Sequence, residues 1–534
     1  MYICSKSFSM KNIYSAFLLF ILPMISMSQT ASIKWWYDVK DSGFGMAAAG
    51  DIDKDGIKEI VFGCYRNDSC IYVLNGNNGT LQWKYNAKSG MAEGCNDVAI
   101  LLYDVDNDDT LDVVVPSSCN PKTFCFNGKN GSIKWQTNTA GSDSPPTIGD
   151  LNGDGKQEIL HGGFDGKILC INAEDGSIAW SHMVFSNSWV QTAPTLVDLD
   201  GNGALDIVVA TWAFNPDTSR MYAYRGIDRS LMWSVPMSKM TYHGTAVGDV
   251  DNDGKPELFI GDYNGMVYCI NGENGTIAWT YQASVYVGAP ITLADVNQDG
   301  QCDVIFCDGY GVGVLDRFGN LMWYYNIPSF GQTFRGVAVA DVDGDWMPDI
   351  VFGTNTGSLY ALRGATGSLL WTVDLKAHIG KDFDINHAPL ISDFDNDGLM
   401  DIFIVGGKTD YPNFQSNYGR AYMVSAGPGH GPDWLMFQHD IRRQSNRCHF
   451  PMGVEDMQRR EYINLYPNPS KDRFKIETSQ KAIMQIHSLH GQPVKYSELS
   501  IGINHIDAGE LQSGIYSVTV MCDKQTKVIK WLKE

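Results

Sequence analysis

Residues 244–282 read GTAVGDVDNDGKPELFIGDYNGMVYCINGENGTIAWTYQ and contain four short apolar segments separated by turn signals. The segments are TAVGDV, ELFIGD, MVYCI and TIAWTYQ, and the breaks are an acidic loop, Tyr-Asn-Gly and Asn-Gly-Glu-Asn-Gly. Asparagine and glycine at such breaks favour tight turns with positive φ. The pattern predicts an antiparallel meander of four strands, which we name A to D in chain order.

The acidic loop of this unit recurs eight times, and every copy runs into a short apolar strand. Successive copies begin 46 to 53 residues apart, at Asp51, Asp104, Asp150, Asp198, Asp249, Asp295, Asp341 and Asp393. A repeat of this length indicates one structural unit used many times. A four-stranded sheet cannot bury both faces alone, whereas radially stacked sheets can. We therefore predict an all-β fold with an eight-bladed β-propeller over residues 29–445. Seven blades are the alternative, because the seventh loop is irregular.

A tryptophan recurs in strand D, mostly within Gly-x-φ-x-Trp, where φ is apolar. The copies are Trp83, Trp135, Trp180, Trp233, Trp279, Trp323 and Trp371, with an eighth at Trp36 in the opening segment IKWWYDV. We interpret them as wedges between adjacent blades. The chain starts with a D-type strand and ends its repeats with a C-type strand, RAYMVSA. We expect the first strand to complete the last blade, which leaves no free sheet edge.

Each acidic loop places acids or amides at positions 1, 3 and 5 and an acid at position 9. Glycine at position 6 allows a turn that brings these side chains around one point. Oxygen donors without nitrogen or sulfur suit Ca²⁺, and clustered carboxylates repel one another without a cation. The loops predict up to eight structural Ca²⁺ sites, and we expect no organic cofactor. The predicted ligands are Asp51, Asp53, Asp55, Glu59; Asp104, Asp106, Asp108, Asp112; Asp150, Asn152, Asp154, Glu158; Asp198, Asp200, Asn202, Asp206; Asp249, Asp251, Asp253, Glu257; Asp295, Asn297, Asp299, Asp303; Asp341, Asp343, Asp345, Asp349; and Asp393, Asp395, Asp397, Asp401.

The loops differ at position 6 in two copies. Asp109 stands there in the second loop, which is tolerable because Asp adopts the left-handed conformation. Trp346 stands there in the seventh, which makes that site the least regular of the eight.

The net charge of −21 is concentrated in these loops, whose positions 1, 3, 5 and 9 hold 29 of the 61 Asp and Glu residues. An acidic chain is a poor partner for nucleic acid or for an anionic membrane surface. The 55 glycines and 12 % aromatic residues are typical of a turn-rich β protein and exclude a disordered chain.

The N-terminus has the features of an export signal, residues 1–28, with Met10 as an alternative initiator. The apolar stretch IYSAFLLFILPMI is too short to span a bilayer, and cleavage is expected before Gln29. We expect no membrane span and an extracellular or cell-surface location, where disulfides are permitted. Cys64 with Cys70 is the first candidate pair and Cys95 with Cys119 the second. Cys125, Cys170 and Cys269 recur at one strand position and are interpreted as buried core residues.

The acidic loop followed by an apolar strand resembles the FG-GAP/VCBS repeats of integrin-like propellers. The strand D motif resembles the repeats of pyrroloquinoline-quinone enzymes and related scaffold proteins. The resemblance implies that the loops joining strands A and B hold structural metals on a lower face. It also implies that ligands meet an upper face made by the D–A and B–C loops.

The C-terminal segment is similar to the type IX secretion sorting domains of Bacteroidetes-type bacteria. The similarity rests on Tyr466-Pro467-Asn468-Pro469, IHSLHGQPV, IDAGELQSGIYSVTV and the basic end KVIKWLKE. We assign this domain to residues 463–534, where we expect a small β-sandwich, and a linker to 446–462. The resemblance implies transfer across the outer membrane by the type IX machinery, which is the expected partner.

Three functions fit these observations. We favour a secreted, non-catalytic, monomeric module that binds a glycan or protein. A lyase-like, polysaccharide-active enzyme is the alternative, with His243 or His387 as its base. A quinone-dependent dehydrogenase fits least, because the chain has no adjacent Cys-Cys pair. The candidate ligand-binding residues of the upper face are Trp189, Trp212, Tyr242, His243, Tyr286, Phe334, Arg335 and His387.

Overall fold

The computed structural model describes residues 31–533 except 89–90, 92, 215–218, 449–462, 467–468, 472, 479–480, 489–491, 501 and 522–525. The predicted signal peptide and most of the predicted linker lie outside the described residues. The chain divides into two compact units. Unit 1 comprises Met1–Lys134, Val296–Gln298 and Tyr325–Phe437, and unit 2 comprises Trp135–Asp295, Asp299–Tyr324 and Gln438–Glu534.

Eight four-stranded sheets are formed within residues 32–427, and in seven of them the strands follow one another in chain order. The first three consist of β2 (Ala48–Gly50), β3 (Glu59–Gly63), β4 (Cys70–Asn75), β5 (Leu81–Asn86); β6 (Leu101–Tyr103), β7 (Asp112–Pro116), β8 (Lys122–Asn127), β9 (Ile133–Asn138); and β10 (Thr147–Gly149), β11 (Glu158–Gly162), β12 (Lys167–Asn172), β13 (Ile178–Met183). The fourth consists of β15 (Thr195–Val197), β16 (Asp206–Ala210), β18 (Arg220–Arg225) and β19 (Leu231–Pro236).

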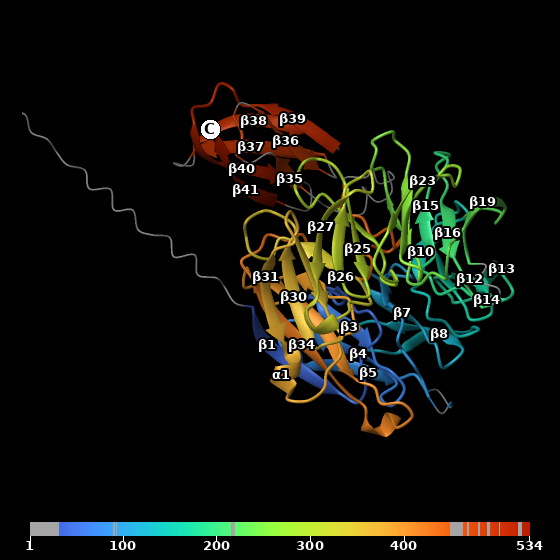
Figure 1. The fold of residues 1–534 in the computed structure, drawn as a ribbon. Helices are drawn as coiled ribbons and strands as arrows, with labels where there is room; N and C mark the ends of the chain where they lie inside the picture. Colours follow the sequence, from blue (N-terminus) through green and yellow to red (C-terminus); the bar gives the residue numbers. More distant parts are fainter. Residues whose placement is uncertain are drawn as a thin grey trace, which may run out of the picture. The chain divides into compact units, whose positions relative to one another are not determined.

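The next three sheets repeat this arrangement (Figure 1). They consist of β20 (Ala246–Gly248), β21 (Glu257–Gly261), β22 (Met266–Asn271), β23 (Ile277–Gln282); β24 (Thr292–Ala294), β25 (Asp303–Asp308), β26 (Gly311–Leu315), β27 (Leu321–Asn326); and β28 (Ala338–Ala340), β29 (Asp349–Gly353), β30 (Ser358–Arg363), β31 (Leu369–Asp374). A short helix, α1 (Leu375–Ile379), follows, and its first turn is capped by the Asp374 carboxylate, which accepts from the Ala377 N–H.

The eighth sheet combines the two ends of the repeat region. It consists of β32 (Leu390–Ser392), β33 (Met400–Lys408), β34 (Tyr418–Gly427) and β1 (Ser32–Val39). In Figure 1, β1 near the N-terminus lies beside β34, and the two pair antiparallel with Trp36 opposite Tyr422. The four-stranded meander and the completion of the last sheet by the first strand are confirmed. The fold is a β-propeller, and the number of blades in a closed ring stays a prediction.

Strand D contributes a tryptophan to the next sheet, as predicted. The Trp83 indole N–H donates to the Gly128 carbonyl, Trp135 to Ala173, Trp233 to Gly272 and Trp279 to Arg317. In the first strand this position belongs to Trp35, whose indole donates to the Gly76 carbonyl at 3.2 Å. The prediction that Trp36 is the wedge residue of this strand was wrong. A bulge between Ile33 and Trp35 shifts the register and leaves Trp36 half exposed.

A glycine in the next turn between strands C and D faces each of these indoles. Gly131, at φ +70°, is so close to Trp83 that an added Cβ would lie 2.7 Å from the ring, and Gly176 and Gly275 face Trp135 and Trp233 in the same way. A side chain at this position would therefore meet both the left-handed backbone and the indole.

The segment after β34 runs along the A strands within each unit. In unit 1, Gly431 exchanges backbone hydrogen bonds with Asp341, Trp434 exchanges them with Ile391, and Leu435 accepts one from Ala49. In unit 2, Ile441, Arg442, Gln444 and Ser445 accept from Ile148, Leu196, Val247 and Leu293 in turn. This tail thus adds backbone pairing to the A strands of each unit.

Two further sheets follow in the C-terminal region. They are β35 (Ile463–Tyr466), β36 (Arg473–Thr478) with β39 (Gly502–Asp507), and β37 (Ala482–Ser488), β38 (Pro493–Leu499), β40 (Gly514–Met521) with β41 (Thr526–Lys533). Both sheets share one apolar core that includes Phe474, Ile486 and the fully buried Trp531. This is the predicted small β-sandwich.

Disulfides join Cys95 to Cys119 and Cys302 to Cys448. The second candidate pair is therefore confirmed, whereas the pairing of Cys64 with Cys70 was wrong. Both of those thiols are free and buried, and the Cys70 thiol donates instead to the Asp68 carbonyl at 3.3 Å. Cys125, Cys170 and Cys269 are buried and free, as expected for core residues.

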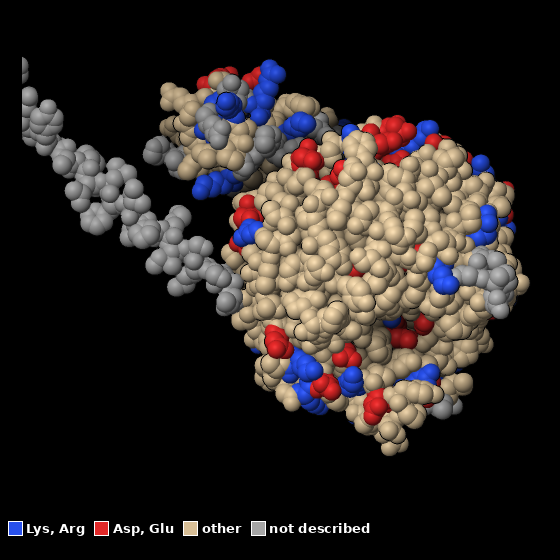
Figure 2. Space-filling model, in the orientation of Figure 1, with Lys and Arg blue, Asp and Glu red and all other residues tan. Residues whose placement is uncertain are grey.

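Charged side chains gather in small groups on the face drawn in Figure 2, and broad areas carry neither sign. None of the helices among the described residues has the length and apolar composition that a membrane span requires.

The contact between Trp83 and Gly131 can be tested by adding one methyl group. Gly131→Ala should destabilise the protein by about 1–2 kcal/mol through its backbone conformation and by about 1–3 kcal/mol more because the indole must move. Gly380→Ala is the control, since Gly380 also has a positive φ but open space around its Cβ position. The melting temperatures of the two variants, measured by calorimetry, give the two losses of stability. Equal losses would contradict the proposed packing.

Candidate metal loops and an aromatic surface

All eight acidic loops share one backbone conformation. Positions 4 and 6 both adopt positive φ in every copy, for example Asn252 at +62° and Gly254 at +88° in the fifth. Asp109 at +70° and Trp346 at +68° show that the two non-glycine residues at position 6 follow the same path. The position 1 carboxylate caps this turn, as Asp249 does by accepting from the Asp253 and Gly254 N–H groups.

The position 9 acid lies at the start of strand B and is buried. In seven loops its carboxylate accepts from the N–H of position 2, as Glu257 does from Val250 at 2.9 Å and Glu59 from Ile52 at 3.0 Å. Burial, with a smaller contribution from the nearby aspartates, raises the pKa of both glutamates to about 7. Burial and the same like-charge repulsion raise the pKa of Asp349 to about 8.

The first loop has buried oxygens without a partner. Asp51 Oδ1 and Asp53 Oδ1 accept no hydrogen bond from any described residue. Ligand oxygens of Asp51, Asp53 and Glu59 lie within 4.8 Å of one another, as do those of Asp249, Asp251 and Glu257. At this distance each pair of negative charges repels by roughly 3 kcal/mol at an effective dielectric constant of about 20. These loops could hold a metal ion.

A lysine ammonium already occupies two other loops. Lys134 Nζ lies 2.7 Å from Asp106, 2.8 Å from Asp112 and 3.6 Å from Asp108 in the second loop. Lys34 Nζ makes ion pairs with Asp395, Asp397 and Asp401 in the eighth. Partial burial lowers the pKa of Lys134, but its hydrogen bonds and charge pairs with the aspartates raise it above the ordinary value overall.

These lysines are the functional residues that the sequence analysis missed. Both stand directly before the strand D tryptophan, where the first loop's sheet has Gln82 and the others have Ala, Met or Leu. Gln82 donates from Nε2 to Glu59 at 2.9 Å and brings no charge. Comparing this one position across the repeats would have revealed the difference.

The seventh loop is also occupied by protein groups. Arg363 makes ion pairs with Asp343, at 2.8 Å, and with Asp345. His430 Nδ1 lies 2.7 Å from Asp341 Oδ2, and its ring stacks on Trp346 at 3.6 Å. The irregular residue at position 6 thus packs against a histidine that contacts the loop's first carboxylate.

Unit 2 has an aromatic surface at the end of its sheets formed by the B–C and D–A connections. Trp189 of β14 (Ser188–Trp189) pairs with Trp212 of β17 (Trp212–Ala213). The Trp189 ring contacts Phe164 and Phe214, and the Trp212 ring contacts Tyr242 and Tyr263. Tyr286 stacks in turn on Tyr263, and all these ring centres lie 4.9–5.8 Å apart. We define the aromatic belt as Phe164, Trp189, Trp212, Phe214, Tyr242, Tyr263 and Tyr286, all of which are partly or fully exposed.

The predicted ligand-binding residues fall into both units. Trp189, Trp212, Tyr242 and Tyr286 lie in the belt, next to His243. Phe334, Arg335 and His387 lie in unit 1, where the Arg335 guanidinium lies over the Phe334 ring and is only 6 % exposed. The structure therefore brings together five of the eight predicted residues and adds Phe164 and Phe214, which the sequence analysis did not select.

Neither candidate base is accessible. His243 is 1 % exposed, and its Nδ1 lies 2.5 Å from the Gly288 carbonyl. His387 is equally buried, and its Nε2 accepts from the Ala47 N–H at 3.0 Å. Burial and the charge of Arg335 lower the pKa of His387 to about 3.

Comparisons with known proteins agree with this architecture. The family described as FG-GAP-like repeat matches residues 51–115, 104–161 and 150–209. The family described as lambda-carrageenase beta-propeller domain matches residues 221–315. The secretion system C-terminal sorting domain matches residues 464–534. Among curated proteins, no sequence matches this chain.

Solved structures with a similar fold include Sqt1 of Saccharomyces cerevisiae, with 11 % identity, a TM-score of 0.53 and coverage of 74 % of this chain and 99 % of that one. Quinohemoprotein alcohol dehydrogenase from Comamonas testosteroni has 14 % identity and a TM-score of 0.52, with coverage of 76 % and 77 %. A europium-containing methanol dehydrogenase has 12 % identity and a TM-score of 0.50, with coverage of 74 % and 93 %. At these identities the likeness shows the fold alone.

The chain is thus a β-propeller protein with FG-GAP-like repeats and a C-terminal sorting domain. The sorting domain indicates export by the type IX secretion system to the cell surface or the extracellular space, and it implies an interaction with that machinery.

The role of Lys134 can be tested in metal-free protein. Lys134→Gln leaves Asp106 and Asp112 without their cation, and it should cost on the order of 2 kcal/mol or more, because breaking a largely buried pair strands a charge. Melting in a chelator measures the loss. Lys156→Gln is the control, since the ion pair of Lys156 with Glu174 is exposed and its removal should leave the melting temperature unchanged. An unchanged melting temperature for Lys134→Gln would show that the ammonium does not stabilise the loop.

Proposed function

We propose that the protein is a calcium-stabilised, secreted glycan-binding propeller. In this proposal the first, third and fifth loops bind Ca²⁺, while Lys134 and Lys34 replace the ion in the second and eighth. Arg363 takes that role in the seventh, and Arg225, whose Nη1 lies 2.6 Å from Asp200, takes it in the fourth. The observation that supports it is the contrast between loops with an internal basic group and loops such as the fifth, where no Lys or Arg of the described residues pairs with a ligand carboxylate.

Calcium is the proposed ion because of the donors. The loops offer carboxylate and amide oxygens on a turn with two left-handed residues, and neither His nor Cys is among the predicted ligands. Such donor sets suit the flexible, oxygen-rich coordination of Ca²⁺, whereas Mg²⁺ demands a tighter cage and dehydrates reluctantly. Each bound ion would fasten the connection between strands A and B.

The proposed glycan site is the aromatic belt. Partly exposed tryptophan and tyrosine rings give apolar faces with polar edges, which suits the C–H faces and hydroxyl groups of sugars. Tyr242, Tyr263 and Tyr286 lie within residues 221–315, which match the propeller domain of a lambda-carrageenase, an enzyme named for its polysaccharide substrate.

Binding is favoured over the lyase alternative by the burial of both candidate bases. A general base must come within hydrogen-bond reach of the proton that it removes, and His243 and His387 are each 1 % exposed. No residue of this chain is assigned to quinone binding.

The calcium assignment has a reciprocal test at one strand position. Lys134→Gln copies the arrangement of the first loop into the second and should add one Ca²⁺ per chain, while Gln82→Lys should remove one. Calorimetric titration of Ca²⁺ into metal-free protein measures the number of ions bound per chain. Asp251→Asn in the fifth loop should weaken Ca²⁺ binding at one site. Asp395→Asn in the eighth loop, which Lys34 occupies, should leave Ca²⁺ binding unchanged. An unaltered stoichiometry in both position-swap variants would contradict the assignment.

The belt is tested by Trp212→Ala. Loss of this ring should weaken binding of the protein's polysaccharide ligand about tenfold, which corresponds to about 1.4 kcal/mol. Affinity electrophoresis against a panel of neutral and acidic polysaccharides identifies the ligand and measures the change. Phe318→Ala removes an exposed ring outside the belt and should have no effect. Release of unsaturated sugar products by the wild-type chain would instead support the lyase.

A further inference from the structure

A pocket of about 620 Å³ lies in unit 1, at the end of the sheets formed by B–C and D–A connections. Three connections contribute residues to it: 64–69 between β3 and β4, 87–88 and 93–100 between β5 and β6, and 409–417 between β33 and β34. Its lining consists of Arg66, Asn67, Lys88, Glu93, Pro412, Asn413, Phe414, Gln415 and Ser416.

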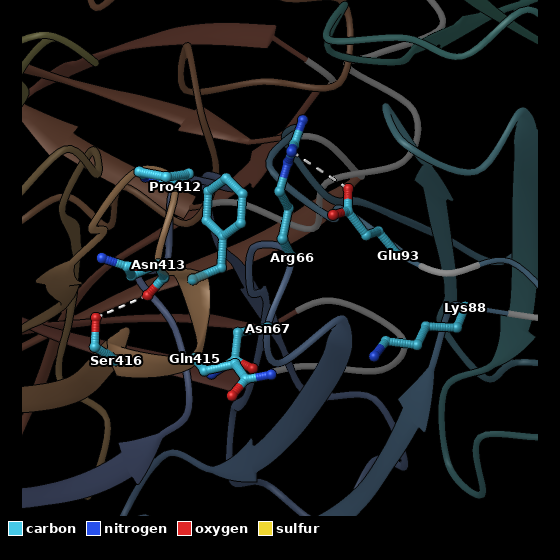
Figure 3. A pocket seen from close by; sticks show the side chains of 9 residues that line it. Arg66, Asn67, Lys88, Glu93, Pro412, Asn413, Gln415 and Ser416 are labelled. Atoms are coloured by element: carbon cyan, nitrogen blue, oxygen red, sulfur yellow. Dashed lines mark hydrogen bonds and ion pairs between the residues drawn. The ribbon is translucent and has the colours of Figure 1, made fainter.

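Arg66 is the central side chain of this pocket. Figure 3 shows it between Pro412 and Asn413 on one side and Glu93 and Lys88 on the other. Its guanidinium lies 5.4 Å from the centre of the Tyr65 ring and 5.0 Å from that of Phe414, so that aromatic contacts hold its position. Nη1 pairs with Glu93 at 3.4 Å, while Nε is buried and has no hydrogen-bond partner among the described residues.

The walls of the pocket are fixed by buried polar contacts. Asp41, which is fully buried, accepts from the Asn417 side chain and from the Asn67 N–H, each at 2.8 Å, and so joins two of the three connections. The third connection is held by the Cys95–Cys119 disulfide and by Asn120, whose side chain donates to the Ala87 carbonyl at 2.8 Å. A ligand would therefore meet a site that is already formed.

The charge of the pocket is unusual for this chain. Two cationic side chains, Arg66 and Lys88, face one carboxylate, Glu93, in a protein whose net charge is −21. The side-chain amides of Asn67, Asn413 and Gln415 add donors and acceptors that suit hydroxyl groups. Tyr411, 80 % exposed, extends the aromatic surface from Phe414 at 5.6 Å.

We infer that this pocket binds an anionic sugar unit, whose carboxylate or sulfate group meets Arg66 and Lys88 while its hydroxyl groups meet the amides. Arginine's planar donors suit both oxyanions. Glu93 competes with the ligand for Nη1. The inference extends the proposed glycan binding and uses residues other than the aromatic belt.

The test uses the full secreted chain at saturating Ca²⁺, with calorimetric titration of three oligosaccharide probes. These are a trigalacturonate, a sulfated galactose oligosaccharide and a neutral galactose oligosaccharide. Arg66→Met should weaken binding of the carboxylate or the sulfate probe at least tenfold, and the probe affected identifies the anion. Glu93→Gln should strengthen the same binding several-fold, because it removes the competing carboxylate.

Arg229→Met is the matched control, since Arg229 also lies over an aromatic ring, that of Trp180, but not in the pocket. It should bind all probes as the wild type does. Wild-type affinity in both Arg66→Met and Glu93→Gln, with unchanged melting temperatures, would overturn the inference, as would equally tight binding of polyglutamate. Loss of neutral-sugar binding in Trp212→Ala reports on the belt alone, so failure of the pocket and failure of the proposed function remain distinguishable.

Discussion

Repulsion between carboxylates gathered in one turn is the constraint on which the rest of this structure depends. Each connection between strands A and B bends through two left-handed residues and brings three or four oxygen donors together. The position 9 acid is buried at the start of strand B, and in seven copies it accepts from the position 2 N–H. A positive charge that enters such a turn relieves this repulsion. The chain supplies that charge itself in some copies, through Lys134, Lys34, Arg225 or Arg363, and in the proposal takes it from solution as Ca²⁺ in others such as the first and fifth.

Two kinds of contact join neighbouring sheets without involving the B–C and D–A connections. On one side, strand D tryptophans such as Trp83 pack on glycines of the next turn between strands C and D. The tail after β34 adds backbone hydrogen bonds to the A strands within both units. With these contacts in place, the B–C and D–A connections can differ from repeat to repeat. They form the aromatic belt in unit 2 and the Arg66 pocket in unit 1.

The repeat could be read from the sequence because it rests on local rules. Alternating apolar runs, Asn-Gly turns and acidic loops predicted every strand of the unit. Cys125 was predicted to be a core residue because a cysteine recurs at the same strand position in other repeats. Other features needed three dimensions. Lys34 reaches the eighth loop from a strand at the other end of the repeat region, and the bulge after Ile33 exchanged the roles of Trp35 and Trp36. Cys64 and Cys70 flank a hairpin and were expected to form a disulfide, but both thiols are free and the Cys70 thiol donates to the Asp68 carbonyl. The surface residues were chosen by loop position, which cannot reveal that His387 and Arg335 are buried.

The most direct measurement of the central claim is an anomalous difference map from crystals of the full chain grown with Ca²⁺. The account predicts ion density between the carboxylates of the first and fifth loops, coordinated by Asp51 Oδ1 and Asp53 Oδ1 in the first, and a lysine ammonium without an ion in the second and eighth. Empty first and fifth loops, or ions that displace Lys134 and Lys34, would contradict it.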